Sequence, residues 1–304
     1  MIQHLIHTEI DKHLWDTCIE RSVNRMPYAL SWWLDAACEG WEALVKDDYS
    51  AVMPLTRNRK LGFDYLYQPF FTQQLGVFSQ QALSPEETDS FLAAIPSKYR
   101  YIDIQLNAAN NPLNTAYSYT ARKNYTLVLS PSYIRLSANF HRNCRRNIRK
   151  AALAGLEVTR GPAPTLFVRF VRQHLDARLR HTGKSFYPVL LQLTMRSIEN
   201  GTGEIWSVYS TGKELMASAW FVNLSDRCLF LVCASTPAGK ENKAMYLLVD
   251  EAIRNKAGTA CIFDFSGSNL AGVAYFNAGF GSEESTYPAV RRNLLPWPLK
   301  LLKK

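Results

Sequence analysis

One stretch near the C-terminus constrains the fold of this chain more than any other. The apolar residues 260–263 end in a carboxylate, Asp264, and after Phe265 a Ser/Gly/Asn cluster follows at residues 266–269. A short aromatic segment then leads into the Gly-Phe-Gly of residues 279–281. This order predicts a buried strand that carries Asp264 to its C-terminal end, a turn, and a helix stopped by glycine. Ligands of open α/β sheets bind beyond the carboxyl ends of strands, so we expect the functional site here.

The size of the chain favours two domains. The chain has 304 residues, of which 47% are hydrophobic and 20% are charged, and this suits two cores of about 150 residues each. The first fifteen residues include Glu9, Asp11 and Lys12, which argues against a signal peptide. No run of about 18 apolar residues is present, so we expect no membrane span and a cytoplasmic protein.

The cysteines and histidines predict neither disulfides nor a metal site. The six cysteines are scattered, without a CxxC pair and without a histidine at zinc-like spacing. Reduced, mostly buried thiols are the expected state. His174 and His181 are seven residues apart on a predicted helix, too far to share a metal. The sequence also contains no G-x-S-x-G elbow, Walker A loop or dinucleotide-binding fingerprint.

Positive charge is concentrated in one segment. The formal net charge is +9, and residues 141–150 contain five cations and no acid. On a helix, Arg142, Arg145, Arg146 and Arg149 share one broad face, with Lys150 beside it. Arginine forks suit phosphate oxygens, so the segment indicates an anionic partner: a nucleotide, a phosphorylated intermediate, tRNA or a membrane surface. A solvated helix face, or pairing with acids of either domain, would explain the same pattern.

The second half predicts the element order β-α-α-β-β-β-α-β-α-β. The expected strands are residues 156–160, 204–210, 215–223, 228–234, 260–265 and 285–290, and the expected helices are 164 to about 180, 186–199, 243–256 and 270–278.

The first half repeats this order less clearly. Strands are expected at residues 2–7, 42–46, 50–57, 63–67, 75–78, 101–106 and 125–129, and helices at 10–21, 31–38 and from Ser84 onward. Residues 132–154 read as one long helix that ends at Gly155. The fold class is therefore mixed α/β in two similar halves.

These features resemble the Fem-type branch of the GNAT acyltransferase superfamily. The resemblance lies in the element order, in Arg-Arg-Asn-Ile-Arg-Lys-Ala at residues 145–151, and in the aromatic helix that runs into Gly-Phe-Gly. It implies two GNAT-like domains, each a mixed central sheet flanked by helices. We expect an N-terminal domain at 1–131, a basic linking helix at 132–155 and a C-terminal domain at 156–304.

The chain departs from the family at two places. Many Fem-type members carry Lys near the acyl donor, where this chain has Asn277. GNAT enzymes that use acetyl-CoA cradle its pyrophosphate with a Gly-x-Gly type of loop, whereas residues 238–245 contain one glycine and two lysines.

The resemblance implies an acyltransferase that moves an acyl or aminoacyl group from an activated, acyl-CoA-like donor to an amine of an anionic acceptor. No covalent intermediate and no covalently bound cofactor are expected, with acyl-CoA as a possible cosubstrate. One alternative is aminoacyl-tRNA-dependent transfer to a peptidoglycan precursor. Another is a non-catalytic GNAT-like protein that binds an anionic ligand. The expected partners are a small or nucleotide-linked anionic substrate, with tRNA as an option, no DNA, and at most peripheral membrane contact.

The same reasoning assigns site residues. Tyr275 is the expected acid for the leaving group, and Asp264 is the expected base, because burial at a strand end would raise its pKa. A core position for Tyr275 and a turn cap or arginine partner for Asp264 are the structural alternatives. The expected donor-binding residues are Cys233, Ala234, Ser235, Thr236, Gly239, Lys240, Lys243 and Asn277. The expected acceptor- or phosphate-binding residues are Arg142, Arg145, Arg146, Arg149 and Lys150.

Overall fold

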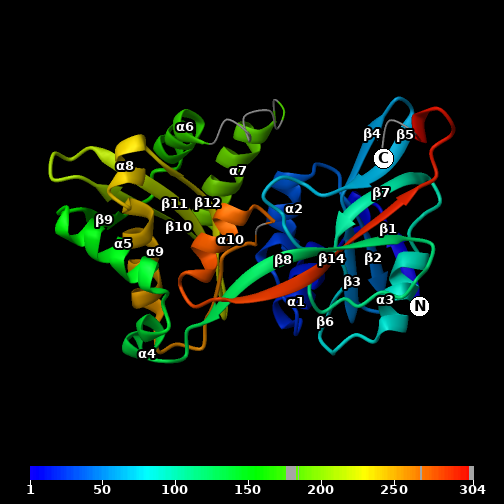
Figure 1. The fold of residues 1–304 in the computed structure, drawn as a ribbon. Coiled ribbons are helices and arrows are strands. Elements are labelled where there is room, and N and C mark those ends of the chain that lie inside the picture. Colours follow the sequence, from blue (N-terminus) through cyan, green and yellow to red (C-terminus); the bar gives the residue numbers. More distant parts are fainter. Residues whose placement is uncertain (176–182, 184, 268, 301–304) are drawn as a thin grey trace. The chain divides into compact units, whose positions relative to one another are not determined.

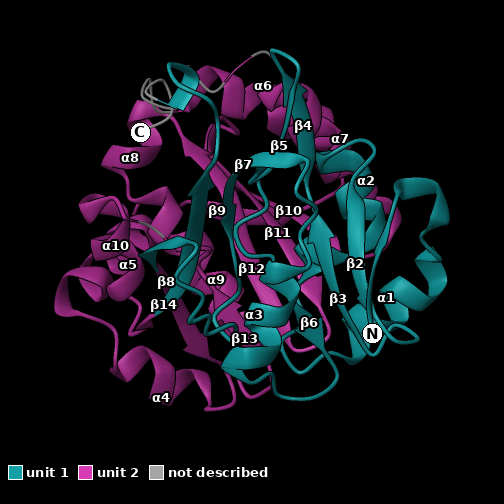
Figure 2. Cartoon of the chain, turned by 90° about the vertical axis from the view of Figure 1, so that its right-hand side faces the viewer, with its two compact units in different colours: residues 1–122, 286–304 teal, residues 123–285 magenta. Residues whose placement is uncertain are grey.

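The computed structural model describes residues 1–175, 183, 185–267 and 269–300. The chain forms two compact units (Figure 2). Unit 1 consists of residues 1–122 and 286–304, and unit 2 of residues 123–285. Both units contain helices and strands (Figure 1), which confirms the expected mixed α/β class.

Unit 1 is built on two sets of strands. The strand orders are β1-β2-β3-β6 in one sheet and β4-β5-β7-β14 in the other. The elements are β1 (Ile2–Leu5), η1 (His7–Glu9), α1 (Lys12–Arg21), η2 (Pro27–Ala29), α2 (Ser31–Ala37), β2 (Glu42–Lys46), β3 (Ala51–Leu55), β4 (Arg57–Lys60), β5 (Phe63–Tyr67), β6 (Phe78–Ser79), α3 (Pro85–Ala93) and β7 (Tyr99–Gln105). Strands β8 (Ser118–Val128) and β14 (Glu283–Asn293) each pass between the two units.

Local sequence signals explain where two helices of unit 1, α1 and α3, begin. Asp11 caps α1 by accepting the backbone N–H groups of His13 and Leu14. Ser84 and Glu87 form a reciprocal capping box at the start of α3, with Pro85 at the first helical position. These are standard solutions for the unpaired N–H groups of a first helical turn.

Unit 2 carries one sheet with the order β8-β13-β12-β11-β10-β9. Its aromatic core includes Phe221, Phe230, Phe263, Phe265 and Phe280. The elements are α4 (Tyr133–Ala138), α5 (Arg142–Leu153), β9 (Glu157–Arg160), α6 (Pro164–His174), α7 (Phe186–Glu199), β10 (Gly203–Tyr209), β11 (Leu215–Leu224), β12 (Arg227–Ser235), α8 (Pro237–Glu241), α9 (Ala244–Lys256), β13 (Ile262–Asp264) and α10 (Ala271–Ala278). The element order expected for the second half is confirmed, and α8 is an addition to it.

Two features of the middle of the chain differ from expectation. Residues 132–154 form two helices, α4 and α5, and not one long helix. The chain breaks between them because the N–H of His141 donates to the carbonyl of Gly279, which ties the break to the end of α10. The compact units also differ from the boundaries 1–131, 132–155 and 156–304. The last strand, β14, pairs with β7, so residues 286–304 belong with unit 1, and both α4 and α5 belong to unit 2.

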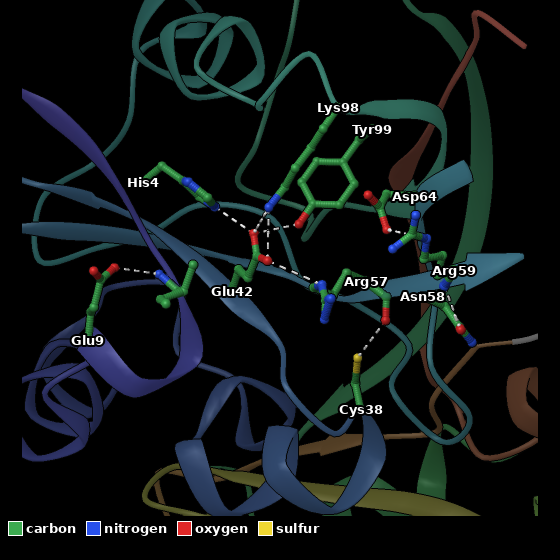
Figure 3. Close-up of polar contacts among 11 residues, drawn as sticks. His4, Glu9, Cys38, Glu42, Arg57, Asn58, Arg59, Asp64, Lys98 and Tyr99 are labelled. Carbon is green, nitrogen blue, oxygen red and sulfur yellow. Dashed lines mark hydrogen bonds and ion pairs between the residues drawn. The ribbon is translucent and has the colours of Figure 1, made fainter. Parts of the chain in front are cut away.

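A buried carboxylate joins the two sheets of unit 1. The side chain of Glu42 on β2 accepts hydrogen bonds from Lys98 at 3.0 and 2.8 Å and from Tyr99 at 2.6 Å (Figure 3). It also contacts His4 on β1 at 2.6 Å and Arg57 on β4 at 3.2 Å. Burial alone would raise the pKa of Glu42, but the hydrogen bonds from Lys98, Tyr99 and His4 outweigh it and hold the pKa below its usual value.

Candidate functional site

The candidate site lies where two parallel strands of unit 2 separate. Strand β12 pairs with β11 along its length, and with β13 only at Arg227, Cys228 and Leu229. Beyond Leu229, within the residues that the structure describes, β12 has no pairing with β13, so one edge of its backbone is left open. A register shift against β11 leaves Leu231 unpaired and further distorts β12 there. Backbone N–H and C=O groups on this edge are available to a ligand.

A cavity of about 360 Å³ lies beside this open edge of β12. A space of this size falls within the range of small-ligand pockets. Its walls come from β12, from the turn after β13, and from α8, α9 and α10. The lining residues are Phe230, Leu231, Cys233, Ser235, Gly239, Lys240, Lys243, Met245, Tyr246, Phe265, Ser266, Gly267, Gly272, Val273, Phe276 and Asn277. The expected position of the site, at the carboxyl end of the β13 strand, agrees with this cavity.

The most unusual side chain in the cavity wall is Asn277. It is 1% exposed, and neither its Nδ2 nor its Oδ1 atom has a hydrogen-bond partner in the part of the chain that the structure describes. The Oγ atom of Ser266, also in the wall, is buried, and it too has no partner among those residues. A buried polar group without a partner costs about 1–3 kcal/mol, so folding alone gives no reason to keep an amide here. A ligand that donates to Oδ1 and accepts from Nδ2 would remove this cost.

Two lysines make one side of the cavity positive. Lys240 lies on α8 and Lys243 immediately precedes α9, and neither has an ion-pair partner among the described residues. No side chain caps the N-terminus of α9, so the positive end of its dipole adds to the lysines. Lys243 and Ser266 both have left-handed backbones, with φ of 62° and 55°. Such conformations are costly for residues other than glycine and concentrate at functional sites.

Gly239 is needed for packing behind the cavity. A Cβ atom at this position would lie 2.1 Å from the carbonyl oxygen of Met216 on β11, which the backbone could not accommodate. The absent side chain lets α8 sit directly on β11, with the hydroxyl of Thr236 accepting the Gly239 N–H at 2.9 Å. The single glycine of this segment therefore fixes the place of the helix that carries Lys240.

Two groups in the wall have perturbed acidity. Burial raises the pKa of Tyr246, more than a hydrogen bond from Asn147 lowers it. The phenol is therefore protonated at neutral pH and able to donate. Burial also raises the pKa of the Cys233 thiol to about 12. A thiol that stays protonated is a weak nucleophile, so the wall offers no activated cysteine.

The structure brings most of the expected donor-binding residues together. Cys233, Ser235, Gly239, Lys240, Lys243 and Asn277 all line the cavity. Ala234 and Thr236 do not belong to the lining. Ala234 is buried, and Thr236 is the N-cap of α8. Sequence reasoning missed Tyr246 and Ser266. Tyr246 sits two residues after the N-terminal residue of α9, and its place follows only from the packing of α9 beside α10.

The two expected catalytic residues lie outside the cavity lining. Asp264 is 1% exposed, and both of its carboxylate oxygens are occupied. Arg227 donates to Oδ2 at 2.7 Å, and the Ser266 N–H donates to Oδ1 at 2.8 Å. Both structural alternatives for Asp264 are therefore present. Tyr275 is 57% exposed, so the core alternative for this residue is wrong. Its hydroxyl accepts a hydrogen bond from Asn143 on α5 at 3.4 Å.

The expected basic residues are all exposed on α5. They are Arg142, Arg145, Arg146, Arg149 and Lys150. Within the part of the chain that the structure describes, none of them forms an ion pair with an acid, so the pairing alternative finds no support. The opposite face of α5 is buried through Cys144, Asn147 and Ala151.

The described residues contain no disulfide, no candidate metal site and no candidate membrane span. All six cysteines are free. Across residues 1–175, 183, 185–267 and 269–300, no cluster of three or more His, Cys, Asp or Glu side chains could hold a metal ion. His181 lies outside the described residues, so its distance from His174 is not defined. No helix among the described residues is both long enough and apolar enough to cross a membrane.

Comparison with known proteins places the fold. No family model and no curated protein matches the sequence. The crystal structure of FemX is similar, with a TM-score of 0.66, 13% identity and coverage of 99% of each chain. A tandem GNAT protein from the clavulanic acid biosynthesis pathway has a TM-score of 0.57 at 9% identity, covering 97% of this chain and 99% of that chain.

A third similar structure is L-PGS from Bacillus licheniformis. Its TM-score is 0.56 at 14% identity, and it covers 96% of this chain and 95% of that chain. At such identities the likeness concerns the fold alone, which this chain shares with FemX and with a tandem GNAT protein. The fold expected from the Fem-type resemblance is confirmed.

Proposed function

We propose that this chain is an acyltransferase that moves an acyl or aminoacyl group from an activated donor to an amine of an anionic acceptor. The donor occupies the cavity between β12 and α10. The observation that carries this proposal is the open backbone edge of β12 beside the unpaired amide of Asn277. The fold of FemX and of a tandem GNAT protein supports it.

The proposed reaction is direct transfer. The acceptor amine attacks the donor's acyl carbonyl, a tetrahedral oxyanion forms, and the donor's thiol or hydroxyl leaves as the new amide is made. Open N–H groups of β12 stabilise the oxyanion, and the walls hold the two reactants in position. Cys233 forms no acyl-enzyme, because its protonated thiol is a poor nucleophile. The proton released by the amine passes to solvent.

Tyr246 is the proposed acid for the leaving group. It lines the cavity, and its raised pKa keeps the phenol protonated. Tyr275 is the competing assignment from the sequence, but its exposed hydroxyl is paired with Asn143 outside the lining. Asp264 has no place in the proposed proton transfer, since Arg227 and the following turn occupy its carboxylate.

An acyl-CoA is the proposed donor. Its phosphates match the positive side of the cavity formed by Lys240, Lys243 and the uncapped start of α9. The neutral Asn277 amide matches amide or carbonyl groups of the donor's chain. The acceptor's negative charge is assigned to the α5 cations, as the sequence predicted. An aminoacyl-tRNA donor and a binding function without catalysis are the alternatives.

Ligand-induced thermal stabilisation tests the proposal. The protein is heated alone, with acetyl-CoA, with desulfo-CoA and with a UDP-linked muropeptide. We expect both CoA compounds to raise the melting temperature, because a ligand that binds the folded state stabilises it. We also expect thiol release from acetyl-CoA when amine acceptors are added. A response to the muropeptide alone would favour the tRNA-dependent alternative, and no response to any of the three would contradict an acyl-CoA site.

A further inference from the structure

A second hollow of unit 2 lies between α4 and α5, away from the donor cavity. Its volume is about 430 Å³, and its lining includes Ile134, Phe140 and Ile148 together with Arg145 and Arg149. It shares none of its lining residues with the donor cavity. The hollow therefore has an apolar floor with two guanidinium groups beside it. This combination suits a molecule with a negative group attached to an apolar one.

The surface beside the hollow also combines positively charged and apolar side chains. Arg142, Arg145, Arg149 and Leu153 follow one another at three- and four-residue spacing and are all exposed, so they form one stripe on the exposed face of α5. Arg146 and Lys150 flank this stripe. The buried residues of α5 lie on the other side. No acid of the described residues neutralises these five cations.

Large aliphatic side chains are exposed within this positive surface. Ile134 on α4 is 80% exposed and Leu153 at the end of α5 is 78% exposed. Exposed aliphatic side chains gain free energy when they leave water. Cations and exposed aliphatics on one helical face are the features of helices that lie in the interface of anionic membranes. An RNA partner would use the cations equally but would gain little from Ile134 and Leu153.

We propose that the α4–α5 surface docks on the surface of an anionic phospholipid bilayer. The α5 cations contact lipid phosphates, and Ile134 and Leu153 enter the boundary between headgroups and acyl chains. The hollow takes the upper part of one lipid, with its phosphate between Arg145 and Arg149 and its apolar part over Ile148. This inference goes beyond the transferase proposal, because it names lipid phosphates as an anionic partner of the α5 cations that were assigned there to the acceptor's charge. Docking requires no acyl donor, so it can be tested separately from transfer.

Vesicle sedimentation tests the docking surface without any assay of activity. The full chain is mixed with vesicles of phosphatidylcholine alone, or of phosphatidylcholine with an equimolar share of phosphatidylglycerol. We expect sedimentation with the anionic vesicles only, and weaker sedimentation as salt is added. Equal behaviour with the two kinds of vesicle would overturn the proposal.

Two pairs of variants separate the bilayer from other anions. R145A with R149A removes two cations, each worth about a fivefold change in bilayer affinity, so we expect a loss of roughly 25-fold. I134S with L153S keeps every charge, and we expect at least about a tenfold loss of vesicle binding, because two aliphatic side chains no longer insert. R145K with R149K is the matched control and is expected to retain most vesicle binding.

Two outcomes would overturn the docking proposal. The first is vesicle binding that is insensitive to I134S with L153S, since a purely electrostatic surface binds RNA or free phosphate in the same way. The second is an RNA oligonucleotide that displaces the protein from the vesicles completely while both aliphatic substitutions leave RNA binding unchanged. Melting temperatures of all variants are expected to stay close to wild type, because every substituted side chain is exposed or at the rim of the hollow.

Discussion

Each unit contains a pair of parallel strands, and the two pairs end in opposite ways. In unit 1, β5 and β7 pair in parallel, and beyond their last paired residues carboxamide side chains make hydrogen bonds to the backbone. Gln68 accepts the N–H of Gln105 at 2.8 Å and donates to the Thr72 carbonyl at 2.6 Å. In unit 2, β12 and β13 separate, and the side-chain amide beside them, Asn277, has no hydrogen-bond partner among the described residues.

Two further carboxamides that follow the unit 1 strands, Asn107 and Asn110, hold the backbone in the same way as Gln68. Asn107 donates to the carbonyls of Leu75 and Val77 at 2.9 and 3.1 Å, and Asn110 makes hydrogen bonds to both the N–H and the carbonyl of Val77 at 2.8 and 3.0 Å. Side-chain amides thus have different roles in the two units. Unit 1 uses these buried amides to hold its own chain, whereas the Asn277 amide of unit 2 lies beside a cavity with neither polar atom paired among the described residues. Unpaired polarity next to a cavity distinguishes a binding site from a scaffold.

The largest expected effect concerns catalysis in the donor cavity of unit 2. Tyr246→Phe removes one hydroxyl from the cavity wall and keeps the ring packed against Phe276. If Tyr246 is the acid, turnover falls by about 10²–10⁴-fold, the usual contribution of general acid catalysis, while donor binding is retained. Thiol release from acetyl-CoA in the presence of an amine acceptor measures the rate.

Tyr275→Phe is the matched control for this change. It removes a hydroxyl that is exposed and lies outside the lining, so we expect turnover near that of wild type. A large loss of turnover in Tyr275→Phe, with Tyr246→Phe active, would return the acid to the residue that the sequence predicted.

The next largest expected effect concerns unit 1, where the buried carboxylate of Glu42 has several hydrogen-bond and ion-pair partners. Glu42→Ala leaves Lys98, Tyr99, His4 and Arg57 around a removed carboxylate. Breaking a buried ion pair from one side costs about 3 kcal/mol of unfolding free energy, measured by urea denaturation. Glu157→Ala is the control, because its pair with Lys213 is exposed and is worth less than about 1 kcal/mol. Equal costs for the two variants would show that Glu42 does not join the sheets.

Asn107→Leu tests the unit 1 carboxamides. The change leaves the carbonyl of Leu75 without its side-chain partner and removes one of the partners of the Val77 carbonyl. We expect a loss of about 2 kcal/mol in unfolding free energy, since buried groups that lose a partner keep the cost of desolvation. A gain of stability here would remove the contrast between the two strand pairs.

The smallest effect is the pH dependence of the Glu42 cluster. Its pKa is lowered in the folded protein, because the hydrogen bonds to Lys98, Tyr99 and His4 outweigh the effect of burial. A lowered folded pKa adds stability above the ordinary pKa, 4.5, and this stability is lost as the pH falls below that value. The difference in unfolding free energy between wild type and Glu42→Gln is therefore expected to shrink in acid. A difference that grows on acidification would reverse the assigned direction.

Much of the fold was predictable, because local signals and tertiary structure agree. The Ser84–Glu87 capping box starts α3 as expected, and the predicted helix at residues 186–199 matches α7. The break between α4 and α5 was not predictable, since it depends on the hydrogen bond from His141 to Gly279, far along the chain. The return of residues 286–304 to unit 1 was missed for the same reason: pairing of β14 with β7 leaves no local signal.

The candidate site was predictable in place more than in detail. The strand, turn and aromatic helix around Asp264 located the cavity, and the lysines and Asn277 followed from their position along the chain. The role of Asp264 was harder to predict, because its partner Arg227 is distant in the sequence. Tyr246 reaches the cavity lining through helix packing, and Ser266 has an unusual backbone angle. Neither feature can be read from the sequence.

The central claim is that the amide of Asn277 is kept for a ligand at the expense of stability. The most direct test is the melting temperature of Asn277→Leu, with and without acetyl-CoA, beside wild type. Leu has a similar size and removes two unpaired buried polar atoms, so we predict a gain of about 1 kcal/mol in unfolding free energy and loss of the stabilisation by ligand. A variant that is less stable than wild type, or that still responds fully to acetyl-CoA, would contradict the account.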